Sequence, residues 1–345
     1  MYKVIIRPLL FLIPPETIHN FVNTALKIIF SIPGSRAVAG SIFKVKRKEL
    51  VRNVAGLEFR NPVGLAAGFD KNGLLYNELS SFGFAFIEVG TVTPKPQPGN
   101  KRPRSFRLVK DKALINRMGF NNVGVDKVIE RLRRKGNKVI IGGNVGKNSV
   151  TANKDAVNDY ETCFEKLYNY VDYFVVNVSC PNISNLTELQ DIDNLGEILE
   201  RLVRIRKGKE VYKPVLLKIS PDLDNNKLDD IIKICEKMDI NGIVCTNTTI
   251  EREGLRTHPG KIERIGSGGL SGKPIKDRST QIIRYINEKT DGRMPIIGVG
   301  GIMSPEDAIE KIEAGATLVQ IYTGFIYEGP FLVKRINKEI LKRFS

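Results

Sequence analysis

The chain has 345 residues, of which 41% are hydrophobic, and this is enough to bury a large core in one domain or two. Its formal net charge of +16 is spread over many short basic stretches, none of which interleaves aromatic and basic residues as a single-strand binder would. We therefore expect no nucleic-acid partner and assign most of the excess charge to solvated surface, with a secondary preference for acidic surfaces.

The chain contains four cysteines: Cys163, Cys180, Cys235 and Cys245. None belongs to a CxxC pair or to a metal-ligand spacing, and there are only two histidines. We expect no metal site, no disulfide framework and a reducing compartment. Three of the cysteines lie in stretches typical of a core, whereas Cys180 directly follows an apolar run and is free to react.

The first 34 residues differ in kind from the rest. An apolar run, Val4–Ile13, is stopped by two prolines, and a second helix is predicted over Glu16–Phe30. Neither run reaches the ~20 apolar residues of a spanning helix, and the apolar segment breaks too early for a signal peptide. Their basic, amphipathic character favours a segment on an anionic membrane surface, and the alternative is ordinary packing against the domain.

After residue 60, short apolar runs alternate with helix-period segments such as Asn225–Lys237 and Pro305–Ala314. Eight runs are almost continuously hydrophobic, as strands buried on both faces are. They are Val63–Gly68, Phe84–Gly90, Lys138–Val145, Tyr173–Ser179, Pro214–Ser220, Gly242–Asn247, Pro295–Gly301 and Leu318–Gly324. Eight βα units predict an α/β fold, a (β/α)8 TIM barrel, rather than a doubly wound sheet with a GxGxxG turn. We expect a two-helix arm over residues 1–40 and a barrel domain over residues 41–345.

Polar residues follow the predicted strands, where they would face one mouth of the barrel. The fourth strand is the clearest case, since Asn177, Ser179, Cys180 and Asn182 follow its apolar run. The alternative is a proline-stopped turn whose asparagines cap the backbone. Across all strand ends, lysines and carboxamides outnumber carboxylates, which favours a pocket for a polar, anionic ring system over paired-acid glycosidase chemistry.

Glycine-rich segments at 268–272, 298–301 and 322–324 are predicted turns after strands six, seven and eight. Such loops in barrels commonly bind phosphate through backbone N–H groups, although glycines also serve tight turns. A phosphate on one side of the mouth and Asn and Lys on the other suit FMN, with a lysine near the electron-accepting edge of the flavin.

Several blocks together resemble the dihydroorotate dehydrogenase family: Asn61–Lys71, Glu88–Gly99, Ile115–Asn122, Thr246–Thr249 and Gly269–Pro274. The resemblance extends from the arm to about residue 340. The arm resembles that of the membrane-associated, quinone-reducing class, and the soluble class lacks such an arm.

The resemblance implies oxidation of (S)-dihydroorotate to orotate in de novo pyrimidine (UMP) biosynthesis, with FMN N5 accepting the hydride and a quinone as final acceptor. It also implies a monomer attached peripherally to the cytoplasmic side of the cell membrane. Three alternatives stay open: a soluble-class acceptor such as fumarate or NAD, another flavin barrel such as a tRNA dihydrouridine synthase, and a binding barrel without turnover.

The resemblance also implies roles for matching residues, with Cys180 as the general base that takes the C5 proton. The FMN contacts fall on Ala67, Gly68, Thr91, Asn144, Asn177, Lys218, Thr246, Gly272, Gly301, Tyr322 and Thr323. The substrate contacts fall on Lys71, Asn116, Arg117, Met118, Gly119, Phe120, Asn177, Asn182, Asn247 and Thr248. The quinone-site candidates are His19, Arg107 and Tyr322.

Two features depart from the quinone-dependent pattern. Such members usually have serine where this chain has Cys180, and the segment after it lacks their frequent Pro-Gly. A thiol suits the role of base, because its ordinary pKa of about 8.5 leaves some thiolate at neutral pH. A nearby Lys71 would lower that pKa further.

Overall fold

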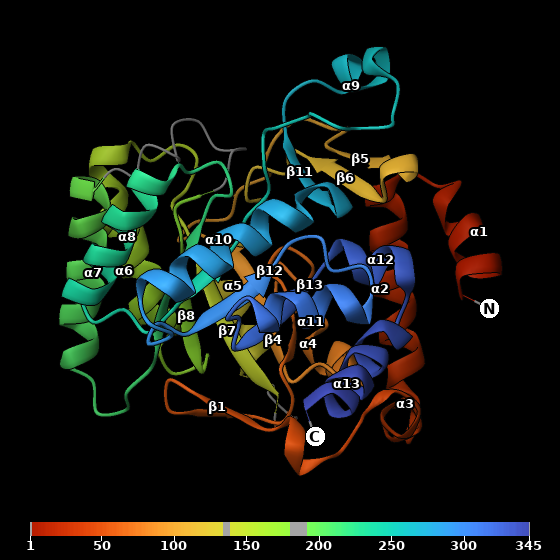
Figure 1. Ribbon diagram of the computed structural model, residues 1–345, viewed down its shortest axis with the longest axis horizontal. Coiled ribbons are helices and arrows are strands. Elements are labelled where there is room, and N and C mark those ends of the chain that lie inside the picture. Colours follow the sequence, from red (N-terminus) through yellow and green to blue (C-terminus); the bar gives the residue numbers. More distant parts are fainter. Residues whose placement is uncertain (1, 134–138, 180–191, 345) are drawn as a thin grey trace.

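The computed structural model describes residues 2–133, 139–179 and 192–344. In these residues, eight parallel strands close into a barrel in the order β10-β12-β13-β3-β4-β7-β8-β9 (Figure 1). Their bounds are β3 (Val63–Leu65), β4 (Phe86–Val92), β7 (Ile140–Val145), β8 (Tyr173–Asn177), β9 (Val215–Ile219), β10 (Ile243–Cys245), β12 (Ile296–Val299) and β13 (Leu318–Ile321). Each strand overlaps one of the eight predicted runs, so the predicted TIM barrel is confirmed.

The strands are apolar because both of their faces are covered. Side chains directed into the barrel, among them Phe86, Tyr173 and Leu216, form an interior cluster, and a larger cluster lies between the strands and the surrounding helices. Three cysteines, Cys163, Cys235 and Cys245, are fully buried and free, which confirms their predicted place in the core.

Helices surround the barrel, and most of them follow a strand. They are α4 (Tyr76–Leu79), α5 (Val125–Leu132), α6 (Ala156–Leu167), α7 (Ile192–Lys207), α8 (Asn225–Lys237), α10 (Lys276–Lys289), α11 (Pro305–Glu313), α12 (Thr323–Glu328) and α13 (Phe331–Phe344). Short 3₁₀ turns lie at Lys48–Leu50, Ser80–Phe82, Val109–Asp111, Asn153–Asp155 and Lys273–Ile275. Helix α8 has the predicted bounds, and α11 begins with a capping box between Ser304 and Asp307.

The N-terminal arm has more helical segments than predicted: a π-helical turn (Tyr2–Ile6), α1 (Arg7–Phe11), α2 (Pro15–Ser31) and α3 (Ser35–Phe43). In Figure 1 it lies along one side of the barrel beside α12 and α13. The sequence did not predict α3, which is short, contains a glycine and runs through residue 40. In the described part of the chain no single helix meets the length and hydropathy expected of a membrane span; α2 and α3, bent by 110°, meet them only as a pair.

Two small antiparallel sheets were also not predicted. One is the hairpin of β1 (Arg52–Val54) and β2 (Leu57–Phe59). The other joins β5 (Ser105–Leu108), β6 (Ala113–Asn116) and β11 (Gly269–Gly272), with α9 (Pro259–Ile265) beyond it in Figure 1.

The prediction of a glycine turn at 268–272 is therefore wrong, because most of this segment is strand β11. Its glycines permit close pairing with β6: a Cβ on Gly268 would lie 2.8 Å from the Asn116 carbonyl oxygen, and one on Gly272 would lie 2.9 Å from Ala113 Cα. Both glycines have positive φ, at +146° and +101°. Here the glycines allow close contact between two strands, in place of the predicted turn.

Candidate active site

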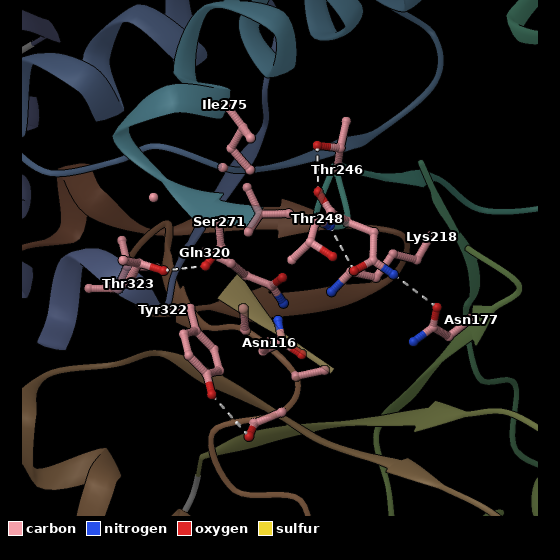
Figure 2. A pocket seen from close by; sticks show the side chains of 18 of the residues that line it. Asn116, Asn177, Lys218, Thr246, Thr248, Ser271, Ile275, Gln320, Tyr322 and Thr323 are labelled. Atoms are coloured by element: carbon pink, nitrogen blue, oxygen red, sulfur yellow. Dashed lines mark hydrogen bonds between the residues drawn. The ribbon is translucent and has the colours of Figure 1, made fainter. Parts of the chain in front are cut away.

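A cavity opens at the carboxyl ends of the barrel strands, with an empty volume of about 1010 Å³ that includes solvent at its mouth. Figure 2 shows side chains on opposite sides of it, with Asn177, Lys218 and Thr248 facing Ser271 and Thr323. Its apolar lining is contributed by residues such as Ala66, Ile275, Val299 and Ile302.

The barrel brings most of the predicted site residues to this cavity. From the predicted cofactor set, the lining includes Ala67, Gly68, Thr91, Asn177, Lys218, Thr246, Gly272, Gly301, Tyr322 and Thr323. From the predicted substrate set, it includes Lys71, Asn116, Met118, Gly119, Phe120, Asn177, Asn247 and Thr248. Cys180 and Asn182 lie outside the described residues.

Two described residues of the predicted cofactor and substrate sets, Arg117 and Asn144, do not line the cavity. Arg117 donates to the carbonyl oxygens of Ile265 and, at 3.1 Å, Ser267, and its guanidinium lies 4.7 Å from the centre of the Phe106 ring. It therefore connects the β6 end to the segment before β11. Asn144 is fully buried behind the cavity wall.

Asn144 belongs to a hydrogen-bond chain that orients groups on the wall. Thr91 Oγ1 donates to Asn144 Oδ1 at 2.5 Å, and Asn177 Nδ2 donates to Thr91 Oγ1 at 2.9 Å. Asn247 Nδ2 in turn donates to Asn177 Oδ1 at 3.3 Å and to Ser179 Oγ at 3.0 Å. Because each amide is held by its neighbours, the wall presents donors and acceptors in fixed directions.

Glu88, on β4, is a buried carboxylate below this wall that was not among the predicted site residues. It is fully buried and accepts hydrogen bonds of 2.6 Å from Asn144 Nδ2 and from Gln320 Nε2. Lys218 Nζ lies 3.8 Å from Glu88 Oε1, so the carboxylate supplies a buried counter-charge to the lysine. The available signal was one acidic residue inside a near-continuous apolar strand, since buried charges are nearly always paired.

Lys71 is the second cation of the cavity. Its Nζ donates to the Gly68 carbonyl oxygen at 2.8 Å. Burial, with a further contribution from the positive charge of Arg104, lowers the pKa of Lys71 to about 8, although Glu16 and Asp70 act in the opposite direction. Lys71 is thus a cation at neutral pH that titrates far below the ordinary lysine range.

The chemistry of the lining fits a flavin nucleotide. Amide, hydroxyl and ammonium groups of Thr91, Asn177 and Lys218 can hydrogen-bond the heteroatoms of a flat ring. The opposite wall contains Gly272, Gly300 and Gly301, whose backbone a phosphate can approach closely because no Cβ intervenes. In the described residues, no group of three or more His, Cys, Asp and Glu side chains has an arrangement suited to a metal ion.

Two of the three quinone-site candidates, His19 on α2 and Tyr322 in the cavity lining, are connected through Phe69. The rings of His19 and Phe69 pack edge to face at 5.3 Å, and those of Phe69 and Tyr322 at 5.5 Å, so an aromatic path leads from α2 to the cavity wall. Burial and the charge of Lys71 lower the pKa of His19 to about 4, and burial raises the pKa of Tyr322 to about 12. Both side chains are therefore neutral hydrogen-bonding groups at physiological pH.

Arg107 contacts another part of the arm. Its Nη1 donates to the carbonyl oxygens of Ile13 at 2.6 Å and Phe11 at 3.3 Å, and the guanidinium lies 4.5 Å from the Phe11 ring centre. Arg107 thus fixes the connection between α1 and α2.

Comparison with known proteins gives a consistent result. The family model for dihydroorotate dehydrogenase matches residues 49–344. A Christiangramia forsetii protein named dihydroorotate dehydrogenase (quinone) is 57% identical over 343 residues, covering 99% of each chain. A Cellvibrio japonicus protein of the same name is 43% identical over 332 residues, covering 95% of each chain. The crystal structure of DHODH from Eimeria tenella in complex with ferulenol has a TM-score of 0.84 and 35% identity, covering 95% of this chain and 91% of that chain.

The Glu88–Lys218 pair leads to a stability prediction. Glu88→Gln removes the carboxylate but not the buried ammonium, and we expect a loss of about 3 kcal/mol in the free energy of unfolding, measured by urea denaturation. The exposed Glu58, on β2, is the matched control, and Glu58→Gln should change stability by less than about 0.5 kcal/mol. Equal stability of both variants would show that the lysine does not need this counter-charge.

Proposed function

The chain belongs to the dihydroorotate dehydrogenase family, and from this premise we propose that it oxidises (S)-dihydroorotate to orotate on FMN, with a quinone as electron acceptor. The observation that carries the proposal is the convergence of Lys71, Asn177, Lys218 and Asn247 on one cavity. The names of the relatives favour quinone over fumarate or NAD, and this family over tRNA dihydrouridine synthases.

FMN would occupy the side of the cavity lined by Thr91, Lys218, Gly272, Gly301 and Thr323. When bound, it supplies the hydride acceptor for C6 of the substrate and the carrier that passes electrons to the quinone. The protein contributes binding and orientation. The Glu88 carboxylate holds the Lys218 ammonium within the barrel end, and the Ser271–Thr323 hydroxyl pair, 2.8 Å apart, braces the glycine wall.

Dihydroorotate would occupy the side lined by carboxamides. The ring of this substrate carries alternating N–H and C=O groups, and Asn116, Asn177 and Asn247 can each donate and accept hydrogen bonds. The Lys71 ammonium is the natural partner for the substrate carboxylate. Cys180 would take the C5 proton as thiolate, three residues beyond Asn177 in the chain.

Residues 1–40 would form the arm that meets the membrane and the quinone, with residues 41–345 as the barrel. The arm exposes more than half of many apolar side chains, including Val4, Ile5, Leu9, Leu12, Phe21, Ile28, Ile29, Ile32 and Val38. Such a surface, together with basic residues, suits peripheral attachment to anionic lipid. The protein would attach as a monomer, on the cytoplasmic side of the membrane. His19, Arg107 and Tyr322 would line the route of the quinone head group.

Turnover measured with several electron acceptors in separate assays tests the proposed function. Under anaerobic conditions, dihydroorotate should bleach the flavin absorbance of the purified holoprotein, and ubiquinone or menaquinone analogues should restore it at the turnover rate. Fumarate and NAD should not. Restoration by either of these would assign a soluble-class acceptor, and a flavin that dihydroorotate leaves oxidised would refute the proposed activity.

Replacement of the base tests the mechanism. We expect Cys180→Ala to slow flavin reduction by about 10²- to 10⁴-fold while FMN stays bound, because only proton transfer is removed. In Cys180→Ser the pH at which reduction accelerates should rise, because a hydroxyl loses its proton less readily than a thiol. Both are measured by stopped-flow reduction, and near-wild-type reduction by Cys180→Ala would exclude Cys180 as the base.

The lowered pKa of Lys71 predicts how ligand binding depends on pH. Lys71 is charged below about pH 8, so orotate affinity should be highest there and should fall as the pH rises through about 8. Equilibrium titration in the Cys180→Ala background keeps thiol ionisation out of the result. Lys71→Gln in that background should bind more weakly with no such transition. Affinity maintained up to the ordinary lysine pKa, near 10.5, would contradict a role for Lys71 in binding the carboxylate.

A further inference from the structure

An ion pair between a buried arginine and a partly buried glutamate links the arm to the barrel mouth. Glu16, in the first turn of α2, accepts hydrogen bonds from Arg104 Nη2 at 2.8 Å and from Arg104 Nε at 3.2 Å. The Arg104 side chain is only 5% exposed and that of Glu16 is 18% exposed. Because two guanidinium nitrogens contact the same carboxylate, the pair fixes the orientation of the two side chains as well as their separation.

The remaining guanidinium nitrogen of Arg104 holds a different segment. Its Nη1 donates to the carbonyl oxygens of Pro98 at 2.6 Å and Asn100 at 3.1 Å. All three nitrogens of the rigid guanidinium are therefore engaged, two toward the arm and one toward the loop that follows β4. A shift of Glu16 relative to the barrel has to displace this loop or break these bonds.

The loop in turn packs against the substrate wall. Asn100 N donates to the Met118 carbonyl oxygen at 3.2 Å, and Gln97 Nε2 donates to those of Gly119 and Phe120, each at 3.1 Å. Met118, Gly119 and Phe120 all line the cavity. The path from Glu16 to the cavity wall consists of three successive groups of direct hydrogen bonds.

Glycines allow the loop at 97–100 and the wall segment at 118–120 to approach each other closely. Gly99 and Gly119 have φ of +73° and +68°, and a Cβ on Gly119 would lie 2.7 Å from Asn100 Oδ1. With so little space between them, displacement of the loop moves the wall as well.

From this path we infer that Glu16 and Arg104 are positioning residues that couple the arm to the substrate wall and thereby set the affinity for dihydroorotate and orotate. The inference rests on the proposed function. Other contacts, namely Tyr2 OH to the Ile326 carbonyl oxygen at 2.6 Å, Arg7 to that of Tyr327 at 3.1 Å and Arg36 to Glu78 at 2.7 Å, also attach the arm. These contacts attach the arm to the barrel without Glu16.

A comparison of two single variants separates positioning from simple electrostatics. Glu16 raises the pKa of Lys71 and Arg104 lowers it, so an effect transmitted only by charge would change orotate affinity in opposite directions in Glu16→Gln and Arg104→Gln. Loss of positioning weakens binding in both. Arg102→Gln is the matched control, because Arg102 also pairs with Glu16, at 3.1 Å, but is 68% exposed.

The experiment uses the full-length holoenzyme. Orotate affinity is measured by equilibrium titration, and dihydroorotate affinity and the limiting rate of flavin reduction by anaerobic stopped flow without quinone. We expect both affinities to fall about tenfold in Glu16→Gln and in Arg104→Gln, within the range of coupling in one hydrogen-bond network. The double variant should bind both ligands no more weakly than the weaker-binding of the two single variants. Arg102→Gln should match the wild type, and the limiting rate should change little in Glu16→Gln.

Three outcomes would overturn the inference: unchanged affinities in Glu16→Gln, opposite changes in the two single variants, or an equal loss in Arg102→Gln. The proposed function is judged separately, on the wild type. A wild-type protein that binds orotate and is reduced by dihydroorotate retains the function even if the coupling fails, whereas one that does neither loses both.

Discussion

The barrel end depends on a single buried carboxylate. Glu88, on β4, is joined by Asn144 from β7, Lys218 from β9 and Gln320 from β13. Four of the eight strands thus meet at one acid from which water is excluded. The arrangement requires a cation and amide donors in these places, and two of these groups, Lys218 and Gln320, also line the cavity. The requirements of fold and of site coincide at this point.

The fold was predictable where one physical rule dominates. Strands covered on both faces must be apolar along their whole length, and this rule located all eight barrel strands. The helical period of the apolar residues gave the bounds of α8. Elements stabilised mainly by tertiary contact escaped prediction. Helix α3 has a weak pattern of its own, and β11 reads as a turn because its glycines serve close contact with β6.

The site was predictable as a set of positions rather than as directions of side chains. The family resemblance named residues that the barrel brings to one cavity. Arg117 is an exception, because its guanidinium donates to the Ile265 and Ser267 carbonyl oxygens instead of lining the cavity. No local sequence rule fixes that rotamer. Glu88 and Arg104 were passed over for a related reason, because a charge inside an apolar strand or a basic loop acquires meaning only from partners distant in the chain.

The arm also bears on how the molecule is synthesised. Tyr2 and Arg7 bond to residues 326 and 327, and β3, the first barrel strand, pairs with β13, the last. During translation these partners leave the ribosome after nearly all of the chain has been made. Until then the barrel has an open edge, and the arm lacks its contacts with residues 326 and 327. The arm therefore completes its docking only near the end of synthesis, and before then its apolar first turns are available to a membrane surface or a chaperone.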